Sequence, residues 1–253
     1  MPSSVLVEAC VDAIDAAIEA ERGGAGRIEL CGELLQGGVT PSAGLVDAVC
    51  ERVGIPIFVL VRPRTGDFLY DADELDVMIR DIAAVKPLGV AGVVIGALTA
   101  DGDVDVATTR TLIQAAHPMQ VTFHRAFDFA RDQGAALQAL LDAGVDRVLT
   151  SGGAATALEG AATLAQLRQK AGDRLTVLAG GKINASNVAE LVRLSGVREV
   201  HVRAALPVES AMRFRRSSAG LSRVAPPGDY ERSATHADEM ARVVESLRSM
   251  TTS

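Results

Sequence analysis

Short hydrophobic runs alternate along the chain with longer stretches in which apolar residues recur every three or four positions. The runs are rich in Val, Ile and Leu, as expected of parallel strands that are buried on both faces. They predict strands at residues 5–10, 27–31, 56–62, 92–97, 119–125, 147–150, 175–179 and 199–202. The pattern therefore indicates a repeated strand–helix unit.

The stretches between these runs predict amphipathic helices, because apolar residues three and four positions apart share one face of a helix. These helices are expected at residues 12–22, 74–86, 105–116, 132–143, 157–171 and 184–194. A further helix begins after Thr40 or Ser42, either of which can cap it. Several helices are followed by glycine, in the segments ERGGAG, LDAG and QKAG, and glycine is a common residue just past a helix end.

About eight strand–helix units in a chain of 253 residues are what a TIM (β/α)8 barrel requires. The alternative is an open, doubly wound α/β sheet, which often carries GxGxxG after its first strand. The corresponding turn reads CVDAID here and contains no glycine. We therefore predict an α/β fold of the TIM-barrel type, in a single domain spanning residues 1–253.

The chain beyond the last predicted strand departs from this pattern. Residues 203–233 contain Pro207, the triplet PPG and several Ser and Arg, which predicts an irregular segment. A closing helix is expected at residues 235–249, with Thr235 and Asp238 as a capping pair. Because so long a loop is unusual in a compact domain, we expect it near the barrel mouth, with the helix completing the outer ring.

Charge and composition argue against some partners. The net charge is -7 and the sequence has no basic run, whereas phosphate backbones are bound by clustered Lys and Arg. Aromatic residues make up 3% of the chain, with no Trp for stacking on bases. No apolar run has the length of a membrane span, and no charged region precedes an apolar stretch at the N-terminus. We expect a soluble, cytoplasmic protein that binds neither nucleic acid nor membranes.

Candidate chemistry is expected at the C-terminal ends of the strands, where the active sites of TIM barrels lie. Glu8 and Cys10 lie two positions apart at the end of the first predicted strand, and Glu29 and Cys31 have the same spacing on the second. Side chains two positions apart on a strand point to the same side. Because neighbouring strands are about 4.8 Å apart, the two cysteines can approach each other at the barrel mouth.

The residues alone leave three interpretations of this group open. Two soft thiolates with a histidine nearby, His124 or His201, would suit Cu(I) or Zn(II). Two carboxylates would instead suit acid–base catalysis or a harder cation. Alternatively, the cysteines are small buried residues, and the glutamates pair with Arg62 or Arg125 inside the barrel.

Glycine turns after the sixth and seventh strands suggest an anion site. They contain Ser151, Gly152, Gly153, Gly180 and Gly181. TIM barrels often hold phosphate in this region through backbone N–H groups near a helix N-terminus. The alternative is that these glycines only permit tight turns.

Charged residues after the third and fifth strands could add to this anion site and supply catalytic groups. Arg62 and Arg64 can clamp an anion with two parallel hydrogen bonds each, unless they are used in internal salt bridges. His124 ends the fifth strand, and Arg125 and Asp128 follow it closely.

An enzyme of this kind would use Glu8 or Glu29 as general base and His124 as the acid, with Asp128 beside it. Its substrate would be a small phosphorylated or carboxylated metabolite, and its reaction would be of the isomerase, lyase or hydrolase type. A third possibility is a scaffold that has lost its chemistry and acts through protein interactions.

Several motifs together make the chain resemble the CutC family of copper homeostasis proteins. They are LVEACVD, AERGGAGRIELC, GGVTPSAGL, VRPRTGDFLY, VTFHRAFD, LTSGG and GDYERSATHADEM, and they run from the first strand to the last helix. The resemblance implies a cytoplasmic TIM barrel that forms a homo-oligomer, with a dimer favoured, and that is associated with copper tolerance. It also implies that Cys10 and Cys31 are the Cu(I) ligands. A polar cluster implied at the barrel mouth comprises Glu8, Glu29, Arg62, Arg64, His124, Arg125 and Asp128.

The chain departs from the family pattern at two positions. Where the family usually has three glycines after the seventh strand, the sequence reads LAGGK, with Lys182 in place of the last glycine. After the eighth strand the family usually has Ser or Gly, whereas this chain reads HVRA, with Arg203 nearby. These departures affect the expected anion site and leave the two cysteines untouched.

Overall fold

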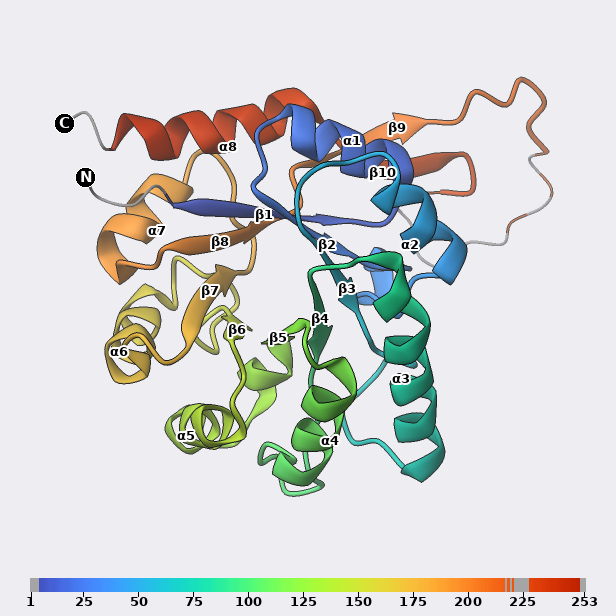
Figure 1. The fold of residues 1–253 in the computed structure, drawn as a ribbon. Coiled ribbons are helices and arrows are strands. Elements are labelled where there is room, and N and C mark those ends of the chain that lie inside the picture. The colour runs from blue at the N-terminus through green and yellow to red at the C-terminus, as the bar shows by residue number, and fades with distance from the viewer. Residues whose placement is uncertain (1–4, 217, 219, 221–227, 251–253) are drawn as a thin grey trace.

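The eight parallel strands form a closed barrel in the order β1 to β8, with β8 pairing back onto β1 (Figure 1). The structure is a computed structural model that describes residues 5–216, 218, 220 and 228–250. The barrel strands are β1 (Leu6–Val11), β2 (Arg27–Leu30), β3 (Ile57–Leu60), β4 (Gly92–Ile95), β5 (Gln120–Phe123), β6 (Arg147–Thr150), β7 (Thr176–Gly180) and β8 (Glu199–Val202). The predicted TIM-barrel fold is therefore confirmed.

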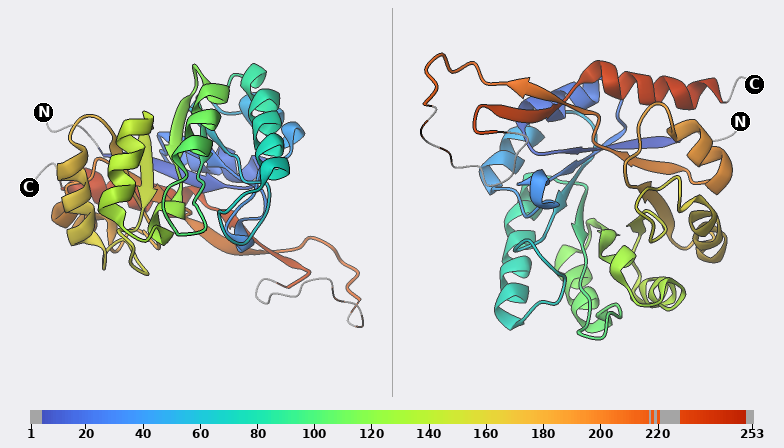
Figure 2. Two further views of the ribbon diagram at one scale, coloured as in Figure 1. Left: turned by 90° about the horizontal axis from the view of Figure 1, so that it is seen from below. Right: turned by 180° about the vertical axis from the view of Figure 1, so that it is seen from behind.

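Helices follow the strands and surround the barrel (Figures 1 and 2). They are α1 (Ile14–Arg22), α2 (Ala43–Cys50), α3 (Ala72–Val85), α4 (Val106–Ala116), α5 (Gln133–Ala143), α6 (Ala161–Ala171), α7 (Val188–Ser195) and α8 (Ala237–Ser249). Three short 3-10 turns are η1 (Leu34–Gln36), η2 (Lys86–Leu88) and η3 (Arg125–Phe129). Ser42 caps α2 through its hydroxyl, which accepts a hydrogen bond from the Leu45 N–H.

Several predicted elements are longer than the observed ones. The fifth strand was expected to reach residue 125, but it ends at Phe123 because the backbone turns into η3. The sixth helix begins at Ala161 instead of residue 157, because residues 152–160 form turns after β6. Both differences lie on the side of the barrel where the strands end, so they shape the loops around its mouth.

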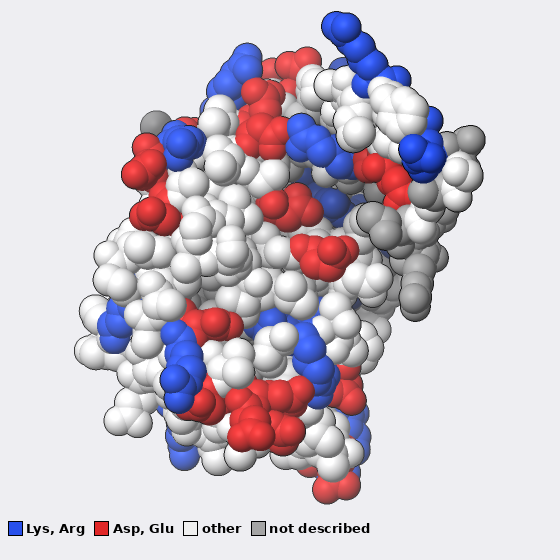
Figure 3. All heavy atoms as spheres, turned by 90° about the vertical axis from the view of Figure 1, so that its right-hand side faces the viewer, with Lys and Arg blue, Asp and Glu red and all other residues white. Residues whose placement is uncertain are grey.

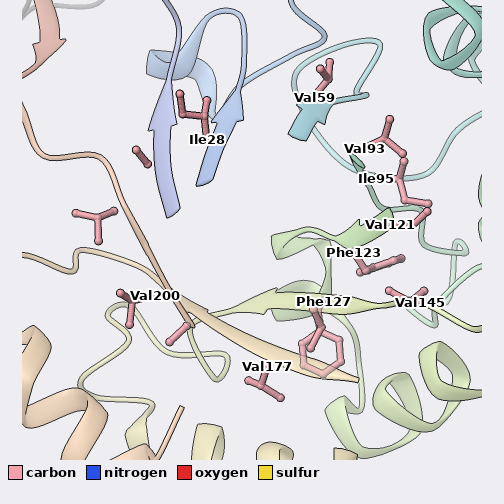
Figure 4. Packing of buried hydrophobic residues seen from close by; sticks show 14 of the residues in the cluster. Ile28, Val59, Val93, Ile95, Val121, Phe123, Phe127, Val145, Val177 and Val200 are labelled. Carbon is pink, nitrogen blue, oxygen red and sulfur yellow. The ribbon is translucent and has the colours of Figure 1, made fainter. Parts of the chain in front are cut away.

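Apolar packing occurs in two layers separated by the barrel wall. Outward-facing residues such as Ile28, Val59 and Val93 pack against the helices and form most of the core (Figure 4). A smaller cluster fills the barrel itself and consists of Cys10, Cys31, Phe58, Leu60 and Val94. The strands are hydrophobic on both faces because both faces are buried.

The segment expected to be irregular contains two strands. β9 (Ala205–Glu209) pairs antiparallel with β10 (Glu231–Thr235), and this hairpin extends from the barrel (Figure 2). The expectation of an irregular segment at residues 203–233 is therefore wrong at both ends. Pro207 lies within β9, and a proline inside a run of five residues argues against predicting a strand from the sequence.

The closing helix α8 lies between α7 and α1 and completes the outer ring, as expected. Its start differs from the prediction, because Thr235 pairs with Ala205 in β10 and the helix begins only after His236. The expected Thr235 cap is therefore wrong. Among the described residues, no helix is long and apolar enough to cross a membrane.

Candidate functional site

A pocket of about 630 Å³ lies over the ends of the strands. Cys10 and His201 line it from β1 and β8, and Arg125, Lys182 and Arg203 line it from the loops that follow β5, β7 and β8. Basic side chains are visible within a hollow on the face shown in Figure 3. This position is the one that TIM-barrel enzymes use for their active sites.

The two cysteines at the ends of β1 and β2 come together, as their spacing predicts. The Cys10 and Cys31 Sγ atoms are 4.0 Å apart, both side chains are buried, and neither is in a disulfide. The Glu29 carboxylate completes a group whose ligand atoms all lie within 4.8 Å of one another. This group has the spacing of a metal site.

His201 joins the group because the barrel closes by pairing β8 with β1, which sets His201 opposite Glu8. Its Nδ1 atom lies 2.8 Å from a Glu8 oxygen, and its Nε2 atom lies 3.5 Å from a Glu29 oxygen. The imidazole therefore bridges the two carboxylates predicted from the first two strands.

A layer of buried ion pairs supports this cluster from below. Arg27 donates hydrogen bonds to both Glu8 and Glu199, and Arg147 Nε donates to Glu199 at 2.6 Å. Both guanidinium groups also lie over the Phe58 ring, at 5.0 and 5.3 Å from its centroid. These contacts orient Glu8 and, through it, His201.

The environment gives the two thiols opposite tendencies to ionise. The hydrogen bond from Cys31 and the nearby His201 hold the pKa of Cys10 well below its usual value, against the effect of burial. The same hydrogen bond, together with burial, raises the pKa of Cys31 well above its usual value. Cys10 is therefore the more readily ionised thiol of the pair.

The carboxylates and the imidazole also differ in charge. Burial alone would raise the pKa of Glu8, but its bonds to His201 and Arg27 lower it to about 2. Burial and the Cys10 charge raise the pKa of Glu29 well above its usual value. Burial opposes protonation of His201, but Glu29 and Cys10 raise its pKa well above its usual value. A thiolate beside an imidazolium can act as a nucleophile or exchange protons.

A family model for the CutC family matches residues 5–206, which is most of the chain. The chain belongs to the CutC family. A CutC family protein of Chromobacterium violaceum is 47% identical over 242 residues, covering 96% of this chain and 98% of that protein. The copper homeostasis protein cutC homologs of Mus musculus and Homo sapiens are 46% and 44% identical, each over 91% of this chain and 85% and 84% of their own lengths.

Solved structures agree with this assignment. The crystal structure of a CutC protein from Streptococcus agalactiae matches with a TM-score of 0.74 and 29% identity, covering 78% of this chain and 97% of that one. Phosphoribosylanthranilate isomerase from Thermotoga maritima matches with a TM-score of 0.58 at 11% identity, covering 97% and 99% of the two chains. The second likeness shows only a shared barrel fold.

His124, the predicted acid of this CutC chain, does not join the cluster. It follows β5, which lies across the barrel from β1, and its Nδ1 accepts a hydrogen bond from the Ala126 N–H at 3.1 Å. The ring packs against Phe68 with 5.0 Å between centroids. Burial, helped by the Arg62 charge, lowers the pKa of His124 to about 3, so the ring is neutral.

The predicted anion clamp, Arg62 and Arg64, is largely engaged in other contacts. Arg62 donates to the carbonyl oxygens of Gly38 and Gly66, both at 2.7 Å, and so holds two loops together. Arg64 pairs with Glu74 and Asp67 at the base of α3. The two guanidinium groups therefore stabilise the loops around the barrel mouth.

The predicted phosphate loop after β6 already contains an anionic group. The Asp128 carboxylate accepts hydrogen bonds from the N–H groups of Ser151 and Gly153, both at 3.1 Å, and from the Thr150 hydroxyl. Arg125 Nε donates to the same carboxylate at 2.7 Å. Asp128 thus occupies the position that a phosphate would need.

The glycines of the two predicted turns have separate local roles. A Cβ atom at Gly152 would lie 2.7 Å from the Gly160 carbonyl oxygen. A Cβ atom at Gly180 would lie 2.5 Å from Leu149 and 3.3 Å from the His201 Cβ atom, so this glycine makes room mainly for the Leu149 side chain and also for His201. Gly181 lines the pocket, and its carbonyl oxygen accepts a hydrogen bond from the Ala157 N–H.

Sequence reasoning named His201 only as a possible neighbour and missed Arg27, Arg147 and Glu199 as its support. The signal was present in the predicted topology, because a closed barrel must pair its eighth strand with its first. Alternating inward positions on β8 would then have set Glu199 and His201 beside the inward face of β1.

Proposed function

We propose that this CutC-family chain binds Cu(I) through Cys10 and Cys31 and takes part in copper homeostasis. The observation that supports this most directly is the 4.0 Å separation of the two free, buried sulfurs at the barrel mouth. Thiolates are soft ligands, and soft ligands select Cu(I) over the harder cations of the cell.

The sulfur spacing favours a bent site over a linear one. With metal–sulfur bonds of about 2.3 Å, sulfurs at this separation subtend an angle of about 120° at a shared metal ion. Such an angle leaves room for a third ligand, and Glu29 is the group in reach of both sulfurs. Because Zn(II) accepts the same ligands, it is the competing metal to be tested.

The names of the relatives support the same proposal, since the mouse and human proteins are called copper homeostasis protein cutC homologs. We also propose a cytoplasmic location, where thiols stay reduced and available to Cu(I). A homo-oligomer, with a dimer favoured, is part of the proposal as well, and sedimentation of the purified protein tests it.

Titration of the reduced protein with Cu(I) against a colour-forming chelator tests the proposal. We expect one equivalent to bind tightly, with binding lost in both Cys10→Ser and Cys31→Ser. Cys50→Ser is the matched control, because Cys50 lies on α2 and not in the cluster, and it should bind as the wild type does. Equal Cu(I) affinity in all four proteins would refute the proposal, and tighter binding of Zn(II) would reassign the metal.

A second candidate function is an enzyme that acts on a small phosphorylated or carboxylated metabolite. The observation that favours it is the thiolate–imidazolium pair of Cys10 and His201 on the floor of an open pocket. Glu29 would hold the mobile proton in such a site, because its pKa is raised. A screen for turnover with wild type and His201→Gln tests this function, and failure of any substrate to react in a His201-dependent way would remove it.

A further inference from the structure

Three cationic side chains converge on the pocket from separate loops. Arg125 follows β5, Lys182 follows β7 and Arg203 follows β8, and all three line the same cavity. Cys10 and His201 lie at the base of that cavity. Loops from three strands thus bring positive charge to the opening above the cysteine cluster.

Two of these cations are not used in ion pairs. Within the described part of the chain, no carboxylate lies within 4.0 Å of the Lys182 ammonium or the Arg203 guanidinium, whereas Arg125 pairs with Asp128. Glu239, the acidic residue that lines the pocket, pairs with Arg242.

Arg203 interacts electrostatically with Asp12. Burial raises the pKa of Asp12, and the Arg203 charge opposes that rise. The two groups therefore interact electrostatically without forming a close ion pair. Asp12 can offset part of the Arg203 charge, whereas no carboxylate among the described residues lies within 4.0 Å of the Lys182 ammonium. The mouth therefore retains positive charge that a ligand can neutralise.

Backbone strain is concentrated around the same pocket. Among the described residues, the non-glycine residues with positive φ are Glu33, Lys182 and Ala204. Lys182 (φ 54°) and Ala204 (φ 44°) line the pocket, and Glu33 directly precedes Leu34, which also lines it. A non-glycine residue with positive φ is strained relative to a relaxed backbone, and strain of this kind clusters at ligand sites. Glycine would adopt the positive φ at position 182 with less strain. The presence of Lys182 there indicates that its side chain has a function.

We propose that this pocket binds a small metabolite through a phosphate or carboxylate group held between Lys182 and Arg203. Arginine can bind such a group with two parallel hydrogen bonds, and lysine adds a point charge. A volume of about 630 Å³ lies within the range of small-molecule sites. The anchored group places the rest of the ligand beside Cys10 and His201.

The binding site does not depend on copper, and it adds to the second candidate function the residues that hold the substrate. The anion site and the reaction can therefore fail separately. If no anion binds to the pocket, this inference is overturned. If an anion binds but no substrate is turned over, only the enzymatic candidate function is overturned.

Calorimetric titration at constant ionic strength tests the proposal, with inorganic phosphate in one arm and succinate in the other. We expect one of these anions to bind in a saturable way, and to bind about ten-fold more weakly to Lys182→Gly and to Arg203→Gln. Lys170→Gln is the matched control, because it removes one positive charge from the exposed end of α6 and should leave binding unchanged.

Lys182→Gly separates binding from folding, because glycine accepts the positive φ at this position. Its thermal midpoint should equal or exceed that of the wild type while its anion affinity falls, and its Cu(I) affinity should not change. If Arg203→Gln fails to fold, Arg203→Lys keeps the charge and should bind phosphate less tightly than the wild type. Failure of both anions to bind, or equal affinity in wild type and both variants, would overturn the proposal.

Discussion

Cys10 and Cys31 are separated by 21 residues, yet their Sγ atoms lie 4.0 Å apart across the neighbouring strands β1 and β2. The two thiols share one hydrogen bond but differ in surroundings, because Cys10 alone lines the pocket and faces His201. The pair is therefore chemically asymmetric, and this asymmetry can be measured.

Cys10 should react first with a small thiol reagent. Its pKa is lowered by the Cys31 hydrogen bond and His201, so it ionises more readily than a free thiol, whereas burial raises the pKa of Cys50. Brief treatment with iodoacetamide followed by peptide mass spectrometry should find Cys10 labelled ahead of Cys31 and Cys50. In urea the three cysteines should be labelled equally, and preferential labelling of Cys31 in the folded protein would contradict the assignment.

Arg27 should contribute strongly to the stability of the barrel interior. Arg27→Ala leaves the buried carboxylates of Glu8 and Glu199 without this partner, and such a loss typically costs about 3–5 kcal/mol. Urea denaturation should show a drop of that order in the free energy of unfolding. Arg80→Ala is the control, because the Arg80 pair with Asp76 lies on the exposed surface, and it should change stability little.

The fold and part of the site could be predicted from the sequence because both depend on local pattern. Strand-end spacing sufficed to bring Cys10 and Cys31 together, since neighbouring strands place equivalent positions side by side. His201 was harder, because its contact with Glu8 arises only when the barrel closes. The contact of the Asp128 carboxylate with the loop after β6 depends on the path of η3, which carries Asp128 and for which the sequence has no periodic signal.

The two histidines at the ends of β5 and β8, His124 and His201, should have opposite charge states. Burial lowers the pKa of His124 to about 3, so its NMR signals should not move between pH 5 and pH 8. His201 should stay protonated over much of that range, because Glu29 and Cys10 raise its pKa. Glu8→Gln removes the carboxylate 2.8 Å from His201 and should lower the His201 pKa, while leaving His124 unchanged.

The raised pKa of His201 also fixes the sign of one contribution to stability. The pKa of His201 in the folded protein lies above the usual value of 6.5. The His201–Glu8 pair therefore makes its full contribution to the free energy of unfolding at pH values below 6.5. Its contribution is lost as the pH rises through the folded pKa. A Glu8→Gln variant should therefore differ most from the wild type at the acidic side of neutrality, and an unchanged His201 titration in that variant would contradict the pairing.

Removal of Asp128 should convert the loop after β6 into an anion site. In Asp128→Ala, the N–H groups of Ser151 and Gly153 and the Arg125 guanidinium lose their shared acceptor. Loss of charge-assisted hydrogen bonds to a buried carboxylate should lower the free energy of unfolding by about 2–4 kcal/mol. The vacated donors then match a phosphate, so phosphate should raise the thermal midpoint of Asp128→Ala by more than that of the wild type. Asp128→Asn keeps an acceptor in place and should gain less from phosphate, whereas equal gains in all three proteins would show that Asp128 does not fill a latent phosphate loop.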